Sequence, residues 1–584
     1  MAEMIKLKGN GVSPGFVTGK AYVLHSDDVF SIPPQSVDNV PQEIARFEDA
    51  LTRTRAEILG IRKKLSTQIG REHSDIFNAH LLILEDRTLI EDVIAILKEK
   101  KVNAEFAFSK VIRRYFQAFS QIDDEYLRER ISDIRDVGKR ILQNLYGEEK
   151  GALENLKEKV ILVAHDLSPS DTAMLDRNKI LAFVTEIGGP TSHTAILGRS
   201  MEIPAVVGVD NATQSVKTGD IVIVDGTHGI FIIEPDATSL EEFSRDEKRF
   251  SDLNTELDKL KNLPAETTDG KRVVLASNIE FHDEIPSVIS HGSDGIGLYR
   301  TEYFYMNRTD LPTEDEQFRA YKQVAENMKP HAVIIRTLDL GGDKFVSALD
   351  VPHEMNPFLG WRAIRFCLTR TDVFKTQLRA ILRASAFGNL KIMYPMISNL
   401  NELRKANELL QESRDELKKE GLTFDEKMEV GAMIEIPSAA MISDILAREV
   451  NFFSIGTNDL IQYALAVDRV NEKIAYLYEP THPAILRLIK QTVDNGHKQG
   501  IWVGTCGEMS SDPGMAALLV GLGIDEISTS PVVLPKVKKI IRTISYAQGL
   551  EIAEKALSFS TGAEIRDYVN DRLREIAGGE LFDV

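Results

Sequence analysis

Cysteine and long apolar runs are both scarce in this sequence. Cys367 and Cys506 are the only cysteines in 584 residues, too few for a disulfide framework. No run of about eighteen apolar residues is present, which excludes an ordinary transmembrane helix. The first residues (MAEMIKLKGNGVSPG) also lack the apolar core of a secretory signal peptide. We therefore expect a soluble, cytoplasmic protein without membrane insertion.

The sequence also has fewer basic residues than acidic residues. Lys and Arg total 70 and Asp and Glu total 89, so the formal net charge is −19. Such a balance argues against a general binder of nucleic acid or anionic membranes. An anionic ligand would need a local basic pocket. One close charge pair near 4 Å is worth roughly 4 kcal/mol at an effective dielectric of 20, whereas charges beyond the roughly 8 Å Debye length are screened.

The chain is long enough for roughly three to four domains. Residues 1–27 contain strand-like sequence that is too short to bury a core alone. From about Asp38 to Tyr146 apolar residues recur at helical spacing, and short β-branched runs return between about 150 and 236. These patterns predict an α/β domain made of residues 1–27 and 150–236, with a helical bundle over residues 28–149 as an insertion.

The second half of the sequence alternates between strand-like and helix-like segments. Residues 238–261 read as one charged helix, which makes residues 237–265 a linker helix before a boundary at Pro264. Apolar runs of strand length then begin at Arg272, Asp294, Ala332, Lys391, Glu429, Phe452, Ile501 and Glu526. Eight β-then-α units in roughly 310 residues predict a (β/α)8 TIM barrel over residues 266–584, whose chemistry sits at the carboxyl ends of the strands.

Polar residues gather at or just past the ends of these predicted strands. They are Asn278, Arg300, Arg336, Glu435, Asn458, Asp459 and Cys506. The arginines, with Arg362 and Arg469, offer planar forks for phosphate and carboxylate oxygens. The barrel is therefore expected to hold a small ligand with two anionic groups.

Two acids and a thiol complete this predicted site. Glu435 and Asp459 are hard carboxylates of the kind that a Mg²⁺ between protein and substrate would require, although each alone could be an ordinary salt-bridge partner. Cys506 could be an inert buried residue or could give or take a proton. Cys367 lies inside a helix-like run and is expected to be inert.

One histidine stands in an unusual setting, GGPTSHTAIL. Thr191 or Ser192 can cap a helix that begins here, which would leave His193 in its first turn. The helix dipole there disfavours an imidazolium and favours a bound anion. A neutral imidazole is a nucleophile, so His193 is a candidate acceptor of a phosphoryl group. A purely structural role for His193 stays open on these residues alone.

Distinctive motifs follow one another along the chain: GGPTSHTAILGRSMEIPAVVG, GLYRTEYFYMNR, IIRTLDLGGDK, NPFLGWRAIR, EVGAMIEIPSAA, SIGTNDLIQYALAVDR and GTCGEM. Together they closely resemble enzyme I of the bacterial phosphoenolpyruvate:sugar phosphotransferase system, and the resemblance covers essentially the whole chain. It implies a phosphoenolpyruvate-protein phosphotransferase that passes phosphate to Nε2 of His193 and then to the carrier protein HPr.

The resemblance also implies a role for each site residue. Substrate phosphate and carboxylate would be held by Arg300, Arg336, Arg469 and Asn458. Mg²⁺ would be bound by Glu435 and Asp459. Cys506 would protonate the enolpyruvate carbon to give pyruvate, and the hydroxyl of Thr172 would hydrogen-bond the histidine. One departure is Pro190, which stands where the family usually has an arginine. We expect this to alter affinity or rate rather than to abolish activity.

The architecture implied is a multidomain α/β protein in which a swivelling phosphohistidine α/β domain, with the inserted bundle, precedes the TIM barrel. The histidine domain would swing between the barrel and HPr. The bundle would be the HPr-binding domain, and the stretch SDIFNAHLLILED would present a docking surface. His80 in this stretch could equally be a plain core or rim residue. The resemblance further implies a homodimer joined through the barrels.

Two other functions stay open on the sequence. A pyruvate phosphate dikinase or phosphoenolpyruvate synthase would share the histidine domain and the barrel, but it would need an additional ATP-binding domain. A non-catalytic regulator that senses phosphoenolpyruvate or HPr would not need His193, both acids and Cys506 together.

Overall fold

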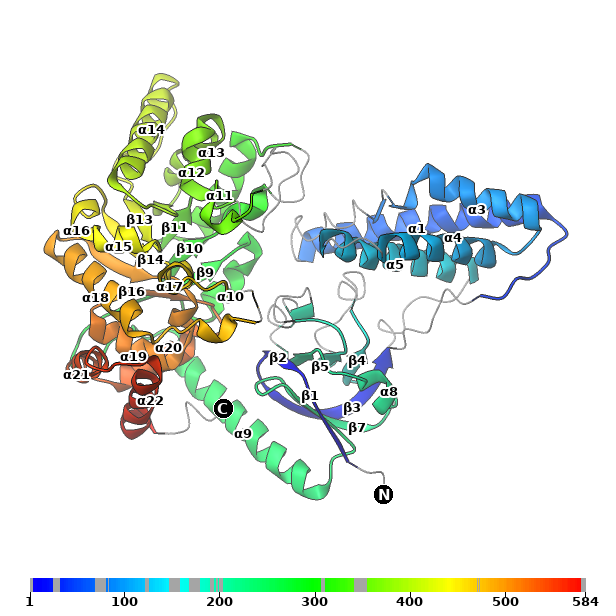
Figure 1. The fold of residues 1–584 in the computed structure, drawn as a ribbon, viewed down its shortest axis with the longest axis horizontal. Coiled ribbons are helices and arrows are strands. Elements are labelled where there is room, and N and C mark those ends of the chain that lie inside the picture. The colour runs from blue at the N-terminus through cyan, green and yellow to red at the C-terminus, as the bar shows by residue number, and fades with distance from the viewer. Residues whose placement is uncertain are drawn as a thin grey trace. The chain divides into compact units, whose positions relative to one another are not determined.

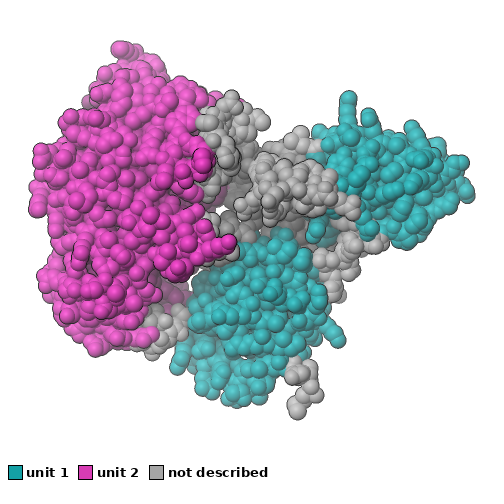
Figure 2. All heavy atoms as spheres, viewed as in Figure 1, with its two compact units in different colours: residues 1–252, 584 teal, residues 253–583 magenta. Residues whose placement is uncertain are grey.

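The protein is described here from a computed structural model. The described residues are 4–24, 32–68, 80, 81, 83–120, 125–146, 158–167, 179–189, 194, 195, 198, 203–305, 310–340, 354–469, 471 and 473–578. The chain divides into two compact units, residues 1–252 with 584 and residues 253–583 (Figure 2). None of the described helices combines the length and the apolar composition that crossing a membrane would demand.

The first unit contains the predicted helical bundle. Its long helices are α1 (Val40–Gln68), α3 (Arg87–Lys100), α4 (Ala104–Ser120) and α5 (Glu125–Tyr146) (Figure 1). Phe47, Leu97 and Phe108 are fully buried among them. Asp86 caps the start of α3, because its side chain accepts a hydrogen bond from the Leu89 N–H at 3.0 Å.

An eight-stranded sheet forms the rest of this unit. Its strands are β1 (Ile5–Lys8), β2 (Asn10–Ser13), β3 (Phe16–Leu24), β4 (Val160–Ala164), β5 (Ile180–Thr185), β6 (Ala205–Val207), β7 (Ile221–Asp225) and β8 (Ile230–Ile233). They lie in the order β1-β8-β7-β3-β4-β5-β6-β2. Strands β3, β4, β5 and β6 run parallel, and the other pairings are antiparallel. The N-terminal strands thus pair with strands that follow the bundle, which confirms that the bundle is an insertion.

Side chains alternate between the two faces of this sheet. In β4, Ile161 and Val163 belong to one buried cluster, whereas Leu162 and Ala164 belong to another. Both faces are therefore covered, as is usual for parallel strands. Helix α9 (Ala237–Leu260) then continues the chain over almost the span predicted for the linker helix.

The second unit is a closed barrel of eight parallel strands. They are β9 (Val274–Ile279), β10 (Gly295–Tyr299), β11 (Ala332–Arg336), β12 (Leu390–Tyr394), β13 (Val430–Ile434), β14 (Phe452–Ile455), β15 (Trp502–Thr505) and β16 (Glu526–Thr529). Pairing of β16 with β9 closes the ring. Each of the eight predicted runs forms one strand, so the predicted TIM barrel is confirmed. Its interior is packed with Leu298, Ile334, Met393, Met433 and Phe452.

Helices surround the barrel strands (Figure 1). They are α10 (Ile285–Ser290), α11 (Glu314–Met328), α12 (Ala363–Thr369), α13 (Thr371–Ser385), α14 (Leu400–Lys419), α15 (Pro437–Met441), α16 (Ser443–Leu446), α17 (Thr457–Leu465), α18 (Pro483–Lys498), α19 (Pro513–Leu522), α20 (Leu534–Thr543), α21 (Tyr546–Ala556) and α22 (Gly562–Ala577). Capping boxes at Thr313, Asn399, Ser545 and Thr561 fix the starts of four of them.

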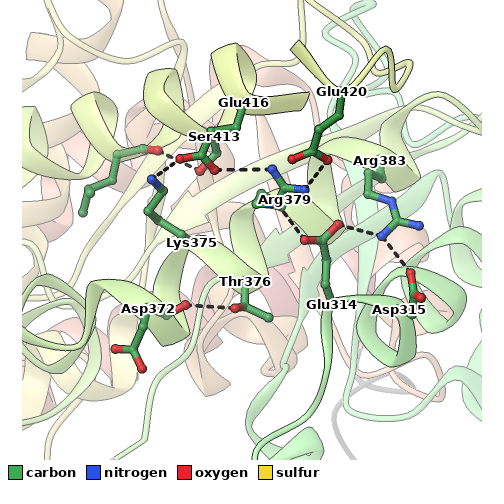
Figure 3. A network of polar contacts seen from close by, with 11 residues as sticks. Glu314, Asp315, Asp372, Lys375, Thr376, Arg379, Arg383, Ser413, Glu416 and Glu420 are labelled. Carbon is green, nitrogen blue, oxygen red and sulfur yellow. Dashed lines mark hydrogen bonds and ion pairs between the residues drawn. The ribbon is translucent and has the colours of Figure 1, made fainter. Parts of the chain in front are cut away.

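A network of ion pairs ties three neighbouring helices of this outer layer together (Figure 3). Arg379 on α13 lies 2.6 Å from Glu314 on α11 and 2.7 Å from Glu420, the residue that directly follows α14. Arg383 also pairs with Glu314, at 2.6 Å, and with Asp315, at 2.8 Å. Because each arginine meets more than one acid, these pairs form a connected network, which stabilises more than isolated surface pairs do.

A buried acid lies at the amino-terminal end of the barrel. Glu526 is the first residue of β16, and among the described residues its Oε1 has no hydrogen-bond partner. Burial raises the pKa of Glu526 to about 7, and the nearby ammonium group of Lys391 lowers it only in part. Lys391 is itself engaged by Glu429, at 2.8 Å, and lies 4.7 Å from the ring centre of Trp502. Glu526 is thus a buried carboxyl that destabilises the barrel when it ionises.

We expect Glu526→Gln to change how the stability of the barrel depends on pH. In the unfolded chain a glutamate loses its proton near pH 4.3, whereas in the folded barrel Glu526 loses it near pH 7. The wild-type protein should therefore lose about 3 kcal/mol relative to the variant as the pH rises from 4.5 to 8. Urea unfolding followed by tryptophan fluorescence measures this loss.

Both tryptophans of the sequence, Trp361 and Trp502, lie in the barrel unit, so the fluorescence reports on that unit. Glu326→Gln, at an exposed position on α11, is the matched control and should keep the wild-type profile. If the free energy of unfolding depended on pH in the same way for Glu526→Gln and wild type, the assignment of Glu526 as a buried ionising group would be wrong.

Candidate functional site

The structure places the sequence-predicted polar residues at the carboxyl ends of the barrel strands. Arg300, Glu435 and Cys506 directly follow β10, β13 and β15, and Arg336 is the last residue of β11. Asn458 and Asp459 lie in the first turn of α17, shortly after β14 ends. Because all eight strands run parallel, these residues share one mouth of the barrel.

Two acidic side chains form ion pairs with Arg336 at the carboxyl end of β11. Its guanidinium lies 2.5 Å from Glu302 and 3.0 Å from Asp339, and only 7% of the residue is exposed. Burial by itself lowers the pKa of Arg336, but the attraction of Glu302 and Asp339 outweighs it and raises the pKa above its usual value. Arg336 therefore stays charged.

Arg362 joins the same group from a distant part of the chain. It precedes α12, and its Nη2 lies 2.8 Å from Asp339 and 3.8 Å from Asp459. Nη1 donates to the Tyr463 hydroxyl at 3.3 Å. Asp339 thus bridges two buried guanidinium groups with one carboxylate oxygen each. The result is an alternating row of charges that runs Glu302, Arg336, Asp339, Arg362, Asp459.

Glu435 adds a further carboxyl to this row. It is 2% exposed, and its Oε1 accepts a hydrogen bond from the Met396 N–H at 2.6 Å. Burial, together with the negative charges of Asp459 and Asp339, raises the pKa of Glu435 to about 8. Acidic groups outnumber the buried arginines here, and a cation would relieve their repulsion.

A divalent metal fits this arrangement. Carboxylate oxygens of Glu435 and Asp459 are ligands that a hard cation prefers, and after burial the charges of Asp459 and Asp339 are the next causes that raise the pKa of Glu435. Across the described part of the chain, no three or more His, Cys, Asp or Glu side chains gather into a metal site of their own. The two carboxylates are thus candidates for part of a coordination shell.

Cys506 sits beside these charges as a protonated thiol. It is 4% exposed, and its S–H points to the Ile455 carbonyl oxygen at 3.9 Å. Burial raises the pKa of Cys506 to about 11, so the thiol keeps its proton at neutral pH. Asn278 donates to the Cys506 carbonyl oxygen at 3.0 Å and accepts from Ser528 at 2.7 Å. Asn278 therefore anchors the backbone that carries the thiol.

The remaining predicted residues form an exposed rim. Arg300 pairs with Glu280, and Arg469 lies 3.4 Å from Glu508. The side-chain oxygen of Asn458 accepts from the Glu508 N–H at 2.8 Å. Exposed ion pairs of this kind contribute less than about 1 kcal/mol, so an anionic ligand can replace the acids at little cost.

Two predicted residues, His193 and Thr172, lie outside the described residues, as does Pro190. The described neighbours Thr194 and Ala195 are helical and buried. His80, which the sequence left open, is fully buried in the bundle with Nδ1 3.7 Å from Asp136, so it is a core residue. Cys367 is fully buried in α12, as expected.

Sequence reasoning missed the acids that hold the arginines. Glu302 and Asp339 follow the arginines of their strands by two and three residues, in LYRTE and IIRTLD. Tyr463 is one turn beyond Asp459 on α17. In the sequence, only closeness to a strand end pointed to these three residues. An acid beside an arginine otherwise resembles an ordinary surface pair.

Comparison with known proteins gives three family matches that together cover most of the chain. Residues 254–546 match the family model described as "PEP-utilising enzyme, PEP-binding domain". Residues 8–130 match "PEP-utilising enzyme, N-terminal", and residues 156–229 match "PEP-utilising enzyme, mobile domain".

Two curated relatives cover nearly the full length. The phosphoenolpyruvate-protein phosphotransferase of Staphylococcus carnosus is 46% identical over 97% of this chain and 99% of its own. That of Bacillus subtilis is 46% identical over 98% of this chain and 100% of its own. A solved structure described as "NMR solution structure of Enzyme I (nEIt) protein" is 43% identical and covers 42% of this chain and 99% of its own, with a TM-score of 0.36, too low to support an argument about the fold.

We expect Asp339→Asn to destabilise the barrel by about 3 kcal/mol, because two buried guanidinium groups would each lose a charged partner. Urea unfolding followed by tryptophan fluorescence measures the loss. The matched control is Glu508→Gln, whose side chain is 72% exposed and pairs with Arg469. This substitution should lower the free energy of unfolding by less than about 1 kcal/mol. Equal losses in the two variants would contradict a central role for Asp339.

Proposed function

This chain belongs to the family of phosphoenolpyruvate-protein phosphotransferases, and on that basis we propose that it passes the phosphoryl group of phosphoenolpyruvate to His193 and then to the carrier protein HPr. This is the first step of sugar uptake by the phosphotransferase system. The observation that carries the proposal is the grouping of buried arginines, excess carboxylates and a protonated thiol at one barrel mouth.

The barrel mouth is suited to a small ligand with two anionic groups. Arg336 is charged and held from two sides, so it is oriented before substrate arrives. Arg300, Arg469 and Asn458 on the rim exchange their acidic partners for the phosphate and carboxylate of phosphoenolpyruvate. Arg362, which pairs with Asp339, is a further substrate-binding residue in this proposal. Binding of this kind fixes the substrate for in-line transfer.

Transfer breaks the bond between phosphorus and the enol oxygen and forms a bond between phosphorus and Nε2 of His193. The enolate that remains takes the proton of the Cys506 thiol at its terminal carbon and becomes pyruvate. Burial raises the pKa of the thiol to about 11, so Cys506 still carries its proton when the enolate forms. Solvent then restores the proton to Cys506.

Mg²⁺ is the metal that we propose for Glu435 and Asp459. When bound, it would supply charge neutralisation to the phosphate and the enolate oxygen. The carboxylates of Glu435 and Asp459 would hold it, and Asp459 also lies 3.8 Å from Nη2 of Arg362. The carboxylates of Asp459 and Asp339, which together with burial raise the pKa of Glu435, support a dication there.

The wider organisation of the protein follows from the same proposal. Residues 1–27 and 150–236 form the phosphohistidine domain, residues 28–149 the HPr-binding domain, residues 237–265 the linker helix and residues 266–584 the substrate-binding and dimerisation domain. Thr172 supports His193 by a hydrogen bond. The histidine domain swings between the barrel and HPr, and the enzyme acts as a homodimer in the cytoplasm.

The direct test of the acceptor is His193→Ala. The wild-type protein should take up label from radioactive phosphoenolpyruvate in the presence of Mg²⁺, whereas the variant should take up none because it lacks the nucleophilic nitrogen. Acid-labile label on the protein measures this. His228→Ala, a histidine at a turn of the same domain, is the control and should be labelled normally. If the His193→Ala variant took up label, the proposal would be wrong.

Cys506→Ala should slow turnover by about 10²-fold or more, the usual contribution of a general acid. The substitution removes a proton donor without removing a charge, so binding of phosphoenolpyruvate should change little. Pyruvate release in a single turnover measures the effect. Cys367→Ala, at the other buried cysteine, controls for loss of packing and should leave turnover unchanged. Equal turnover in the two variants would mean that Cys506 has only a structural role.

A further inference from the structure

A buried glutamine joins the two segments that carry the acidic partners of Arg336. Gln377 belongs to α13 and is fully buried. Its Oε1 accepts a hydrogen bond from the Leu338 N–H at 2.8 Å, and its Nε2 donates to the Thr301 hydroxyl at 3.0 Å. One side chain therefore connects the segment that follows β10 to the segment that follows β11.

Each of these two contacts is one residue away from an acid that pairs with Arg336. Glu302 follows the threonine directly, and Asp339 follows the leucine directly. Glu302 lies 2.5 Å from Nη2 of Arg336, and Asp339 lies 3.0 Å from Nη1. Since each acid holds a different nitrogen, the separation of the two acids sets the position of the guanidinium. Gln377 spans the two backbones, so its side chain helps to fix that separation.

Thr301 connects Gln377 to Arg336 by a second route. The Thr301 hydroxyl donates to the backbone carbonyl oxygen of Arg336 at 2.9 Å, while it accepts from the glutamine amide. Hydrogen bonds thus run in one direction, from the Leu338 N–H through the amide and the hydroxyl to this carbonyl. A glutamine suits that place because its amide both accepts and donates. All four residues are buried, so a broken link would leave a polar group without a partner.

Neighbouring side chains fix the orientation of the amide. Nε2 of Gln377 also donates to the Tyr321 hydroxyl at 3.2 Å, and that hydroxyl donates to Gln317 at 3.1 Å. Tyr321 and Gln317 lie on α11, and the ion pair of Arg379 with Glu314 also joins α13 to α11 (Figure 3). The amide is therefore held in place before any ligand binds.

We propose that Gln377 is a positioning residue for phosphoenolpyruvate, and that it acts through the two acids that orient the guanidinium of Arg336. The inference rests on the proposed function, since it needs Arg336 to hold an oxygen of that substrate. Arg362 shares Asp339, so a shift of this acid would disturb both arginines. A binding group that is held loosely binds its ligand less tightly, so loss of Gln377 weakens substrate binding.

The test measures pyruvate release in a single turnover over a range of phosphoenolpyruvate concentrations, with Mg²⁺ and the full-length protein. Gln377→Met keeps much of the shape of the side chain but lacks its hydrogen-bonding groups. This variant should need about tenfold more phosphoenolpyruvate for the half-maximal rate. The rate at saturation should change little, because bound substrate draws the arginine back into place. Thr301→Val removes one hydroxyl and should give a smaller shift in the same direction.

The double variant Gln377→Met/Thr301→Val shows whether the two residues act along one chain of hydrogen bonds. Residues that act through each other are not independent, so the double variant should shift the half-maximal concentration by less than the product of the two single shifts. A shift equal to that product would mean that the two residues act separately, and the inference would be wrong.

Gln317→Met is the matched control. Gln317 is also fully buried, and it accepts from the Tyr321 hydroxyl and donates to the Pro312 carbonyl oxygen at 3.3 Å. Among the hydrogen bonds between described residues, none joins Gln317 to Thr301 or Leu338. This control should lose stability in urea, as Gln377→Met does, yet keep the wild-type half-maximal concentration.

The outcomes separate this inference from the proposed function. If wild type releases no pyruvate from phosphoenolpyruvate, the proposed function fails. If wild type is active but Gln377→Met keeps its half-maximal concentration, the inference alone is wrong. It is also wrong if Gln317→Met gives the same shift, because the cause would then be a general loosening of the packing. If Gln377→Met does not fold, Thr301→Val decides, and an unchanged half-maximal concentration in that variant overturns the inference.

Discussion

Parallel strands end at a common edge, and this constraint brings the functional groups of the protein together. In the barrel, closure between β16 and β9 turns that edge into a ring on which Arg336, Glu435 and Cys506 meet although they are far apart in sequence. In the sheet, the ends of β4 and β5 bring His165 to Glu186 in the same way. In both units, titratable side chains therefore meet at one edge of parallel strands.

Local electrostatics decide what the barrel mouth can bind, in spite of the net charge of −19. Asp339 keeps two guanidinium groups buried and charged, while burial and the charges of Asp459 and Asp339 raise the pKa of Glu435. The gathered carboxylates favour a cation, and the exposed arginines of the rim favour an anion.

Much of the fold could be predicted because its patterns are local. Each barrel strand is a short apolar run, and the helical spacing of residues such as Phe47 identified the bundle. The site arginines and acids followed from their places at strand ends. Glu302 and Asp339 did not, because their importance depends on burial, and burial depends on packing between segments distant in sequence. The pairing of His165 with Glu186 depends on strand order in the same way, since β4 and β5 are neighbours only in the folded sheet.

The helical bundle lies in the sequence between two strands that are neighbours in the sheet, and this limits how the chain can connect them. Strands β3 and β4 are adjacent and parallel, and the bundle is the segment that joins them. A parallel pair requires a crossover of a dozen or more residues, since the chain must travel back to the opposite edge before the next strand begins. The bundle therefore serves as an enlarged crossover, and a shortened protein could replace it with a single helix but not with a tight reverse turn.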